Sequence, residues 1–112
     1  MRIGELARRS GVSTRALRHY EEKGLLAARR GANGYREYDE ADVRLVQEIR
    51  ALMAVGFTLE DARPFVACLR AGNESGGVCP ESVDVVRRKL TEIDTEIRDL
   101  MARRDEMLRR NT

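Results

Sequence analysis

Residues 13–26 read STRALRHYEEKGLL, and their side chains alternate between two kinds with the period of a helix. At 100° per residue, polar and basic side chains fall on one face and apolar side chains on the other. The first face holds Arg15, Arg18, His19 and Glu22, and the second holds Ala16, Leu17 and Tyr20. A helix that only covered a core would need the apolar face alone. The basic face therefore indicates a surface that binds a partner.

The residues around this helix complete a helix-turn-helix pattern. Ser13 is a good N-cap for the helix, and Gly24 is a natural stop after its last turn. Upstream, a short amphipathic helix is predicted by apolar residues at the i, i+3, i+4 spacing, namely Ile3, Leu6 and Ala7. Residues 10–12, Ser-Gly-Val, separate the two helices. Two helices joined by a tight turn that contains Gly are typical of this motif.

Residues 27–38, AARRGANGYREY, predict a hairpin directly after the second helix. The pair Asn33-Gly34 is the strongest short-range hairpin signal, because both residues tolerate a positive φ. Tyr35 and Tyr38 favour extended structure, and arginines decorate the segment. We interpret it as a small two-stranded wing.

Two further helices and a loop are predicted next. Asp39 caps a helix over about residues 40–55, and a second helix is predicted over about 58–70. Pro64 lies inside the second segment, so that helix either is kinked there or begins later. Residues 71–79, AGNESGGVC, form a Gly-rich loop.

The pattern changes between Pro80 and about Arg110, where apolar residues alternate by three and four. The series consists of Val83, Val86, Leu90, Ile93, Ile97, Leu100 and Met107, with Arg104 in its one polar position. Such a heptad seam would run along a helix of roughly 45 Å. A single helix cannot bury its own seam, and the chain holds no second long heptad. We therefore expect the same helix of another copy to cover it, which predicts a homodimer.

The net charge of the chain is only +2, but the positive excess lies in one segment. Residues 1–38 hold nine basic and four acidic residues, whereas 39–71 and 72–112 are slightly acidic. A basic excess in one segment is typical of a polyanion binder. A dimer with two helix-turn-helix units predicts two half-sites on double-stranded DNA. With one His and no Ser/His/Asp set, paired-carboxylate motif or phosphate-binding Gly loop, the sequence does not favour an enzyme.

The chain shows no signal peptide and no apolar run of membrane-spanning length. We therefore expect a cytoplasmic protein without a membrane partner, in which Cys68 and Cys79 are normally reduced. Free cysteines are often inert buried residues. Alternatively, the two approach across the Gly-rich loop and form a disulfide or bind a soft metal with two ligands. Spacing alone does not decide between these alternatives.

Four segments in this order, IGELARRSGVS, TRALRHYEEKGLL, NGYREY and VRLVQEIRALMAVGFTLEDA, resemble the MerR family of bacterial transcription regulators. The resemblance is close over about residues 2–70, and the last helix fits in kind. It implies a mainly α protein with a winged helix-turn-helix domain over 1–38, a linker helix pair over 39–71, a loop over 72–79 and a dimerisation helix over 80–112. In the homodimer, two such helices would form an antiparallel coiled coil.

The resemblance also implies a mechanism. Family dimers bind promoters whose spacer between the two polymerase-recognised elements is unusually long, and they bend and underwind that DNA so that RNA polymerase engages both elements. Deforming DNA costs on the order of several kcal/mol, which the protein contacts must offset. Family members usually continue into a metal-binding loop or a larger ligand-binding domain, whereas this sequence stops at Thr112. We therefore expect a short form in which sensing does not rest on a C-terminal effector domain.

Carried over by position, the DNA contacts come from the second helix and the wing. The resemblance assigns Ser13, Thr14, Arg15, Arg18, His19 and Tyr20 of the helix, and Arg36 and Tyr38 of the wing. Tyr35 lies beside Arg36 in the wing, and we expect both to hold phosphates. Arg is the usual reader of guanine, and wing side chains typically hold phosphates. His19 stands where relatives commonly have Tyr, and Tyr20 fits a core position as well as a phosphate contact.

Two other functions stay open at this point. An architectural, excisionase-like protein would bend DNA without an effector. A thiol-based redox or metal sensor would work through Cys68 and Cys79. Metal-sensing relatives have a cysteine near the start of the dimerisation helix, where Cys79 lies, but their other ligands come from a later cysteine loop that this sequence lacks. A complete metal site of that type, and hence a metal cofactor, is not expected.

Overall fold

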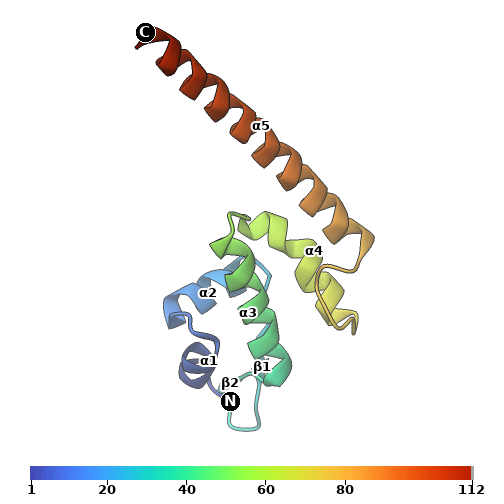
Figure 1. Ribbon diagram of the computed structural model, residues 1–112. Coiled ribbons are helices and arrows are strands. Elements are labelled where there is room, and N and C mark those ends of the chain that lie inside the picture. The colour runs from blue at the N-terminus through green and yellow to red at the C-terminus, as the bar shows by residue number, and fades with distance from the viewer. Residues whose placement is uncertain (112) are drawn as a thin grey trace.

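A long helix projects from a group of shorter helices in the computed structural model, which describes residues 1–111 (Figure 1). The group, here called the head, contains α1 (Ile3–Ser10), α2 (Thr14–Glu22), β1 (Arg29–Arg30), β2 (Arg36–Glu37), α3 (Glu40–Ala54) and α4 (Leu59–Arg70), and the long helix is α5 (Pro80–Arg110). The molecule measures 73 × 29 × 20 Å along its principal axes. This mainly α architecture with a hairpin wing confirms the predicted fold class.

The four helices of the head share one core. Helix α1 packs against α2 and α3, and α3 packs against α4. Leu6, Leu17, Val46 and Ile49 are fully buried between them, and Phe65 joins them from α4. Burying one such side chain stabilises the fold by roughly 1.5–3 kcal/mol. Helix α2 is therefore held by its apolar face, and its orientation follows from the core.

Local capping groups set the helix ends where the sequence predicts them. The Oγ atom of Ser13 accepts a hydrogen bond from the N–H of Ala16, and Gly24 follows α2 with a φ of 74°. Asp39 and Thr58 each form a capping box with the acidic residue three positions later. These partners lie within a few residues of one another, so the caps depend on local sequence alone.

Helix α4 runs through Pro64 as one element, so the alternative of a later start is wrong. Proline removes one backbone hydrogen bond from a helix interior. The capping box at Thr58 precedes the proline, and buried Ala62 and Phe65 flank it. Capping and packing on both sides of Pro64 therefore hold the helix together.

The wing forms as the Asn-Gly signal predicts. Strands β1 and β2 pair antiparallel with Arg30 opposite Arg36, and Gly34 in the turn has a φ of 81°. After β2 the chain meets its own N-terminus: the Met1 ammonium donates to the Tyr38 carbonyl at 2.6 Å, and the Tyr38 N–H donates to the Met1 carbonyl at 2.7 Å. The start of the chain is thus tied to the wing.

Two links fasten the base of α5 to α4. Cys68 in the last turn of α4 and Cys79 at the N-cap of α5 form a disulfide, with their Cα atoms 5.9 Å apart. The expectation that both thiols are reduced is therefore wrong for this structure, because the Gly-rich loop returns the chain to α4. Near the other end of α4, the Asp61 carboxylate lies 2.8 Å from Nη2 of Arg88 and 2.9 Å from Nζ of Lys89.

Asp61 should make the stability of the protein depend on pH. Burial raises the pKa of its carboxyl, but hydrogen bonds from Lys89 and Thr58 outweigh burial and lower the pKa to about 2. Because this pKa lies below that of an unfolded Asp, the contribution is complete above about pH 4 and is lost as the pH falls toward about 2. We expect the free energy of unfolding to fall by roughly 2 kcal/mol more in the wild type than in Asp61→Asn.

Thermal unfolding of both proteins across this pH range measures the difference. The other carboxylates are the same in the two proteins, so their titration cancels in the comparison. Parallel curves for the wild type and Asp61→Asn would contradict the assignment of the low pKa to Asp61.

Candidate nucleic-acid interface

Helix α2 presents the basic face that the sequence predicts. Arg15, Arg18 and His19 are exposed, whereas Leu17 and Tyr20 pack into the core. The apolar face holds α2 against α1 and α3, so the basic side chains project from a fixed helix. A rigid helix with a basic outer face is suited to the major groove of duplex DNA.

The two residues at the start of α2 occupy different environments. The side chain of Ser13 is exposed and its Oγ atom serves as the N-cap, while Thr14 is half-buried in the first turn. The N-terminal end of a helix carries backbone N–H groups that favour a phosphate oxygen. Ser13 and Thr14 therefore lie where a contact to the DNA backbone would be made.

One acidic residue of α2 joins this helix to the wing. The Glu21 carboxylate accepts a hydrogen bond from the Tyr38 hydroxyl, and its second oxygen lies 3.2 Å from Nη1 of Arg36. Burial and the hydrogen bond to Glu21 raise the pKa of the Tyr38 hydroxyl, which therefore stays protonated as a donor. Glu21 escaped prediction because, beside Glu22 and Lys23, it reads as a solvated surface charge.

Arg2 extends the basic surface from the start of the chain. Its guanidinium carbon lies 4.0 Å from the centre of the Tyr35 ring. Arg2, Arg18 of α2 and Arg36 of β2 border one surface hollow of about 190 Å³, together with Ile3 and Tyr35. Three cationic side chains from separate segments thus meet where the wing adjoins α2. The basic excess of the first third of the chain was the only sequence signal for Arg2.

Two of the predicted DNA-contact residues, Tyr20 and Tyr38, have side chains that lie in the core. They are 6% and 2% exposed. The hydroxyl of Tyr20 lies 3.9 Å from Sδ of Met53 in α3, and that of Tyr38 is bonded to Glu21. Both rings fill space between α2, the wing and α3, so they support the elements that carry the basic side chains.

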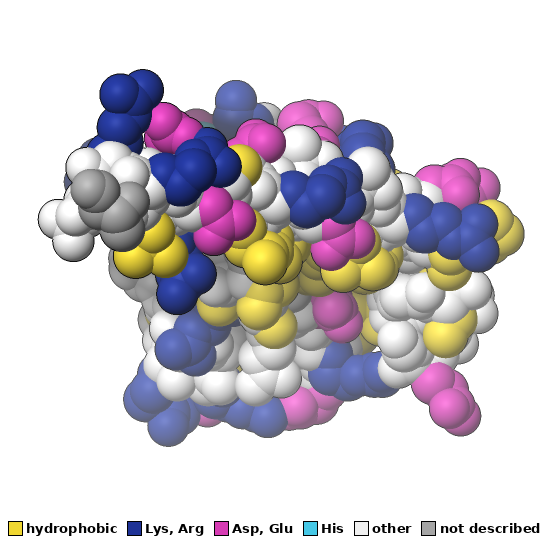
Figure 2. All heavy atoms as spheres, turned by 45° about the horizontal axis from the view of Figure 1, so that its top comes forward, with side chains coloured by type: hydrophobic (Ala, Val, Ile, Leu, Met, Phe, Trp, Pro, Cys, Tyr) yellow, Lys and Arg dark blue, Asp and Glu magenta, His cyan; other side chains and the backbone are white. Residues whose placement is uncertain are grey.

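Apolar side chains gather along one side of α5 (Figure 2). Leu90, Ile93, Ile97, Leu100 and Met107 of the predicted seam are between 43% and 68% exposed. The first two seam residues, Val83 and Val86, are half-buried, and Val86 packs against the core of its own chain. Val85, which lies off the predicted seam, is buried. The first turns of α5 therefore belong partly to the head, and the exposed seam begins at Leu90.

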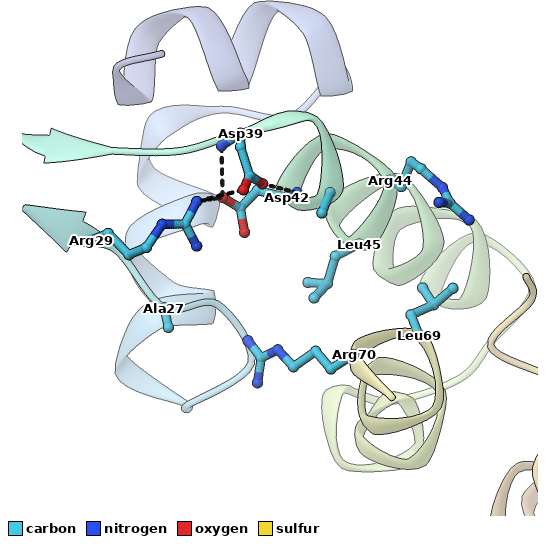
Figure 3. Close-up of a pocket in the computed structure, with 9 residues that line it drawn as sticks. Ala27, Arg29, Asp39, Asp42, Arg44, Leu45, Leu69 and Arg70 are labelled. Atoms are coloured by element: carbon cyan, nitrogen blue, oxygen red, sulfur yellow. Dashed lines mark hydrogen bonds and ion pairs between the residues drawn. The ribbon is translucent and has the colours of Figure 1, made fainter. Parts of the chain in front are cut away.

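Another hollow, of about 360 Å³, lies between the wing, α3 and α4 (Figure 3). Nη2 of Arg29 lies 2.7 Å from the Asp39 carboxylate and 3.5 Å from that of Asp42. Arg70 points across from α4 and donates to the Leu25 carbonyl at 2.8 Å. These charged groups fasten β1 to α3 and α4 to the segment after α2. None of the predicted DNA contacts lines this hollow.

Within residues 1–111, no group of three or more His, Cys, Asp or Glu side chains is placed to hold a metal ion. The two cysteine sulfurs are joined to each other. A search of the same described part of the chain finds no helix with the length and apolar character that crossing a bilayer requires. The features of this surface that suggest a binding partner are thus the basic face of α2, the wing and the seam of α5.

Two known protein families together match residues 1–110 of the chain. A family described as MerR HTH family regulatory protein matches residues 1–67, which include α1, α2, the wing, α3 and most of α4. A second family, described as MerR, DNA binding, matches residues 43–110, which reach to the end of α5.

Individual proteins of similar sequence or structure are also transcription regulators. The chain is 36% identical over 100 residues to the HTH-type transcriptional regulator HmrR of Rhizobium leguminosarum bv. viciae, covering 89% of this chain and 75% of the relative. The transcription regulator PbrR691 from Ralstonia metallidurans CH34, solved with lead(II), has a TM-score of 0.75 at 28% identity and covers 96% of this chain and 82% of its own. HiNmlR, a MerR family regulator lacking the sensor domain, was solved bound to promoter DNA. It shares the fold, with a TM-score of 0.62 at 23% identity over 94% of this chain and 78% of the HiNmlR chain.

Proposed function

The chain belongs to the MerR family and is a DNA-binding transcription regulator rather than an enzyme, and we propose that it binds promoter DNA as a homodimer and bends and untwists that DNA for RNA polymerase. The observation that supports this most directly is the meeting of Arg2, Arg18 and Arg36 beside the exposed face of α2. Family membership favours a regulator over a purely architectural DNA binder.

In this proposal α2 lies in the major groove and the wing follows the neighbouring backbone. Arg15 and Arg18 reach base edges, with His19 beside them on the same face. Tyr35 and Arg36 of the wing hold phosphates and set the register of the protein on the duplex. Ser13, Thr14 and Arg2 add backbone contacts, the first two through the start of α2 and Arg2 through the hollow that it shares with Arg18 and Arg36.

The seam of α5 supplies the second half of the proposal. Apolar side chains repeated every three and four residues along an exposed helix favour a coiled coil with a second copy of α5. An antiparallel pairing, as in the family, would place the two heads at opposite ends. Two α2 helices would then enter two half-sites, and α5 would set their separation. A separation that does not match relaxed DNA is what forces the duplex to bend and untwist.

Arg18→Ala tests the placement of α2 on DNA. We expect specific binding to weaken by about 1–3 kcal/mol, as for the loss of a base-reading contact. Mobility shift with the DNA upstream of the protein's own gene, at fixed salt and with excess competitor, measures the effect. Arg98→Ala is the matched control, since it removes the same charge from an exposed position on α5.

The control should bind like the wild type. Full affinity and specificity in Arg18→Ala would remove α2 from the interface. An equal loss in Arg98→Ala would show that net charge, and not the position of Arg18, governs binding.

A further inference from the structure

We propose that the Cys68–Cys79 disulfide is a reversible redox site whose reduction loosens the base of α5 and weakens DNA binding by the dimer. This regulation rests on the DNA-binding function proposed above. The reactants that fit the site are small: a dithiol for reduction and a hydroperoxide for oxidation. Three features support it, namely access to the sulfurs, the groups around each sulfur, and the second link between α4 and α5.

The sulfurs are reachable from one side. Both cysteines line a surface hollow of about 470 Å³ beside α4 and the start of α5. Its other walls are formed by Arg63, Pro64, Ala67, Ala71 and Glu81. Cys68 is 2% exposed whereas Cys79 is half-buried, so a small reactant meets Cys79 first.

After reduction, the groups around Cys68 favour a thiol, whereas those around Cys79 favour a thiolate. Sγ of Cys68 lies 3.5 Å from the Ser75 carbonyl, which accepts the proton of a thiol. Sγ of Cys79 lies 3.4 Å from Nδ2 of Asn73, whose N–H suits a thiolate. Cys79 is also the N-cap of α5, and the positive end of a helix favours a thiolate. Cys79 is therefore the nucleophile of the reduced pair, and Cys68 closes the disulfide.

Oxidation and reduction of the cysteine pair each transfer two electrons. In oxidation, the Cys79 thiolate attacks one hydroperoxide oxygen, the O–O bond breaks, and the alkoxide takes a proton and leaves as an alcohol, so that Cys79 becomes a sulfenic acid. The Cys68 sulfur then attacks Cys79, the S–O bond breaks, and hydroxide leaves as water with the Cys68 proton. In reduction, a dithiol transfers two electrons and two protons by thiol–disulfide exchange and becomes a cyclic disulfide.

Contacts that do not involve the sulfurs hold the loop between α4 and α5. Nδ2 of Asn73 donates to the Cys68 carbonyl at 2.9 Å, and the buried Ser82 hydroxyl donates to the Gly76 carbonyl at 2.6 Å. Gly76 lies so close to α4 that a Cβ atom there would come within 2.9 Å of the Phe65 carbonyl oxygen. The two sulfurs therefore stay near each other after reduction, and the bond re-forms.

The second link determines what reduction changes. Asp61 holds Arg88 and Lys89 independently of the cysteines, so reduction removes the covalent link and leaves α5 attached through this ion pair and the loop contacts. At 1.5 Å per residue, Leu100 lies roughly 17 Å beyond Lys89, so a small rotation of α5 about this ion pair shifts the seam. In the dimer, such movement changes the separation of the two heads. The oxidised form is the more preorganised one and should bind DNA more tightly.

The test uses the full chain, DNA from upstream of its own gene, and the double variant Cys68→Ser/Cys79→Ser. Each protein is treated with dithiothreitol or with tert-butyl hydroperoxide. Free thiols are counted by alkylation and mass spectrometry, and affinity is measured by mobility shift at fixed salt. For the wild type we expect alkylation of both cysteines and an affinity at least about fivefold lower after reduction, with both changes reversed by the peroxide. The double variant should bind equally in both buffers.

Three results would overturn the proposal. They are a disulfide that resists dithiothreitol in the folded protein, a wild-type DNA affinity that is the same in both redox states, and a double variant whose DNA affinity changes with redox treatment as that of the wild type does. Specific binding by the wild type with equal affinity in both states removes the redox site alone. Absence of specific binding by the wild type in both states, with a folded circular dichroism spectrum, removes the proposed function as well. If the double variant fails to fold, reversal in the wild type decides the outcome.

Discussion

Replacing Ile93 and Ile97 together by Asp should convert the protein to a monomer and lower its specific DNA affinity by roughly a hundredfold or more, because two linked half-site contacts become one. The two side chains are 43% and 48% exposed in the single chain, so the head does not depend on them for its stability. In the dimer they would lie within the seam. Each would contribute roughly 1.5–3 kcal/mol by burial, and a carboxylate in either place would lack a partner.

Sedimentation and mobility shift measure the two effects, and the chain offers a matched control. Thr91→Asp/Thr95→Asp adds the same charge to α5, at exposed positions outside the apolar series. This control should remain dimeric. Arg104→Leu changes the polar position of the seam and should tighten the dimer. Dissociation of the Thr pair, or an intact dimer in the Ile pair, would show that the seam does not join two copies.

The helix ends and the wing were predictable because each depends on a few neighbouring residues. Ser13, Asp39 and Thr58 cap helices through hydrogen bonds that close within three positions. Gly34 supports the hairpin through its own positive φ. The periods of the apolar residues then decided which face of α2 is buried. No distant part of the chain needs to be known for any of these features.

Side-chain roles that depend on distant segments were not predictable. Glu21 becomes a link only because the wing returns Arg36 and Tyr38 to α2. Tyr38 follows a strand of two residues, which is too short to show by alternation which way its ring points. Val85 is more deeply buried than Val83 because α4 packs against that side of α5. The heptad pattern of α5 alone does not indicate where α4 packs.

The pairing of the cysteines is a similar case. A loop of this length between Cys68 and Cys79 can extend far from the head or fold back on itself. The hydrogen bonds of Asn73 and Ser82 and the close approach of Gly76 to α4 fold it back. Each of these contacts is tertiary, so the spacing of the cysteines alone could not decide between a disulfide, a metal site and two inert thiols.

The two faces of α2 should respond differently when each is truncated. Leu17 is 0% exposed, and Leu17→Ala should lower the free energy of unfolding by about 2–5 kcal/mol, since α1 and α3 close only partly over the cavity. Arg15 lies two positions earlier on the exposed face. Arg15→Ala should change the free energy of unfolding by no more than about 0.5 kcal/mol and should instead weaken specific DNA binding.

Urea unfolding measures the first quantity, and mobility shift at a temperature where both variants are folded measures the second. Because the two substitutions share a helix and a product residue, helix propensity does not account for a difference between them. A stability loss in Arg15→Ala as large as in Leu17→Ala would show that Arg15 on the basic face also stabilises the fold. Weak DNA binding by fully folded Leu17→Ala, equal to that of Arg15→Ala, would mean that the position of α2, and not the chemistry of its outer face, limits recognition.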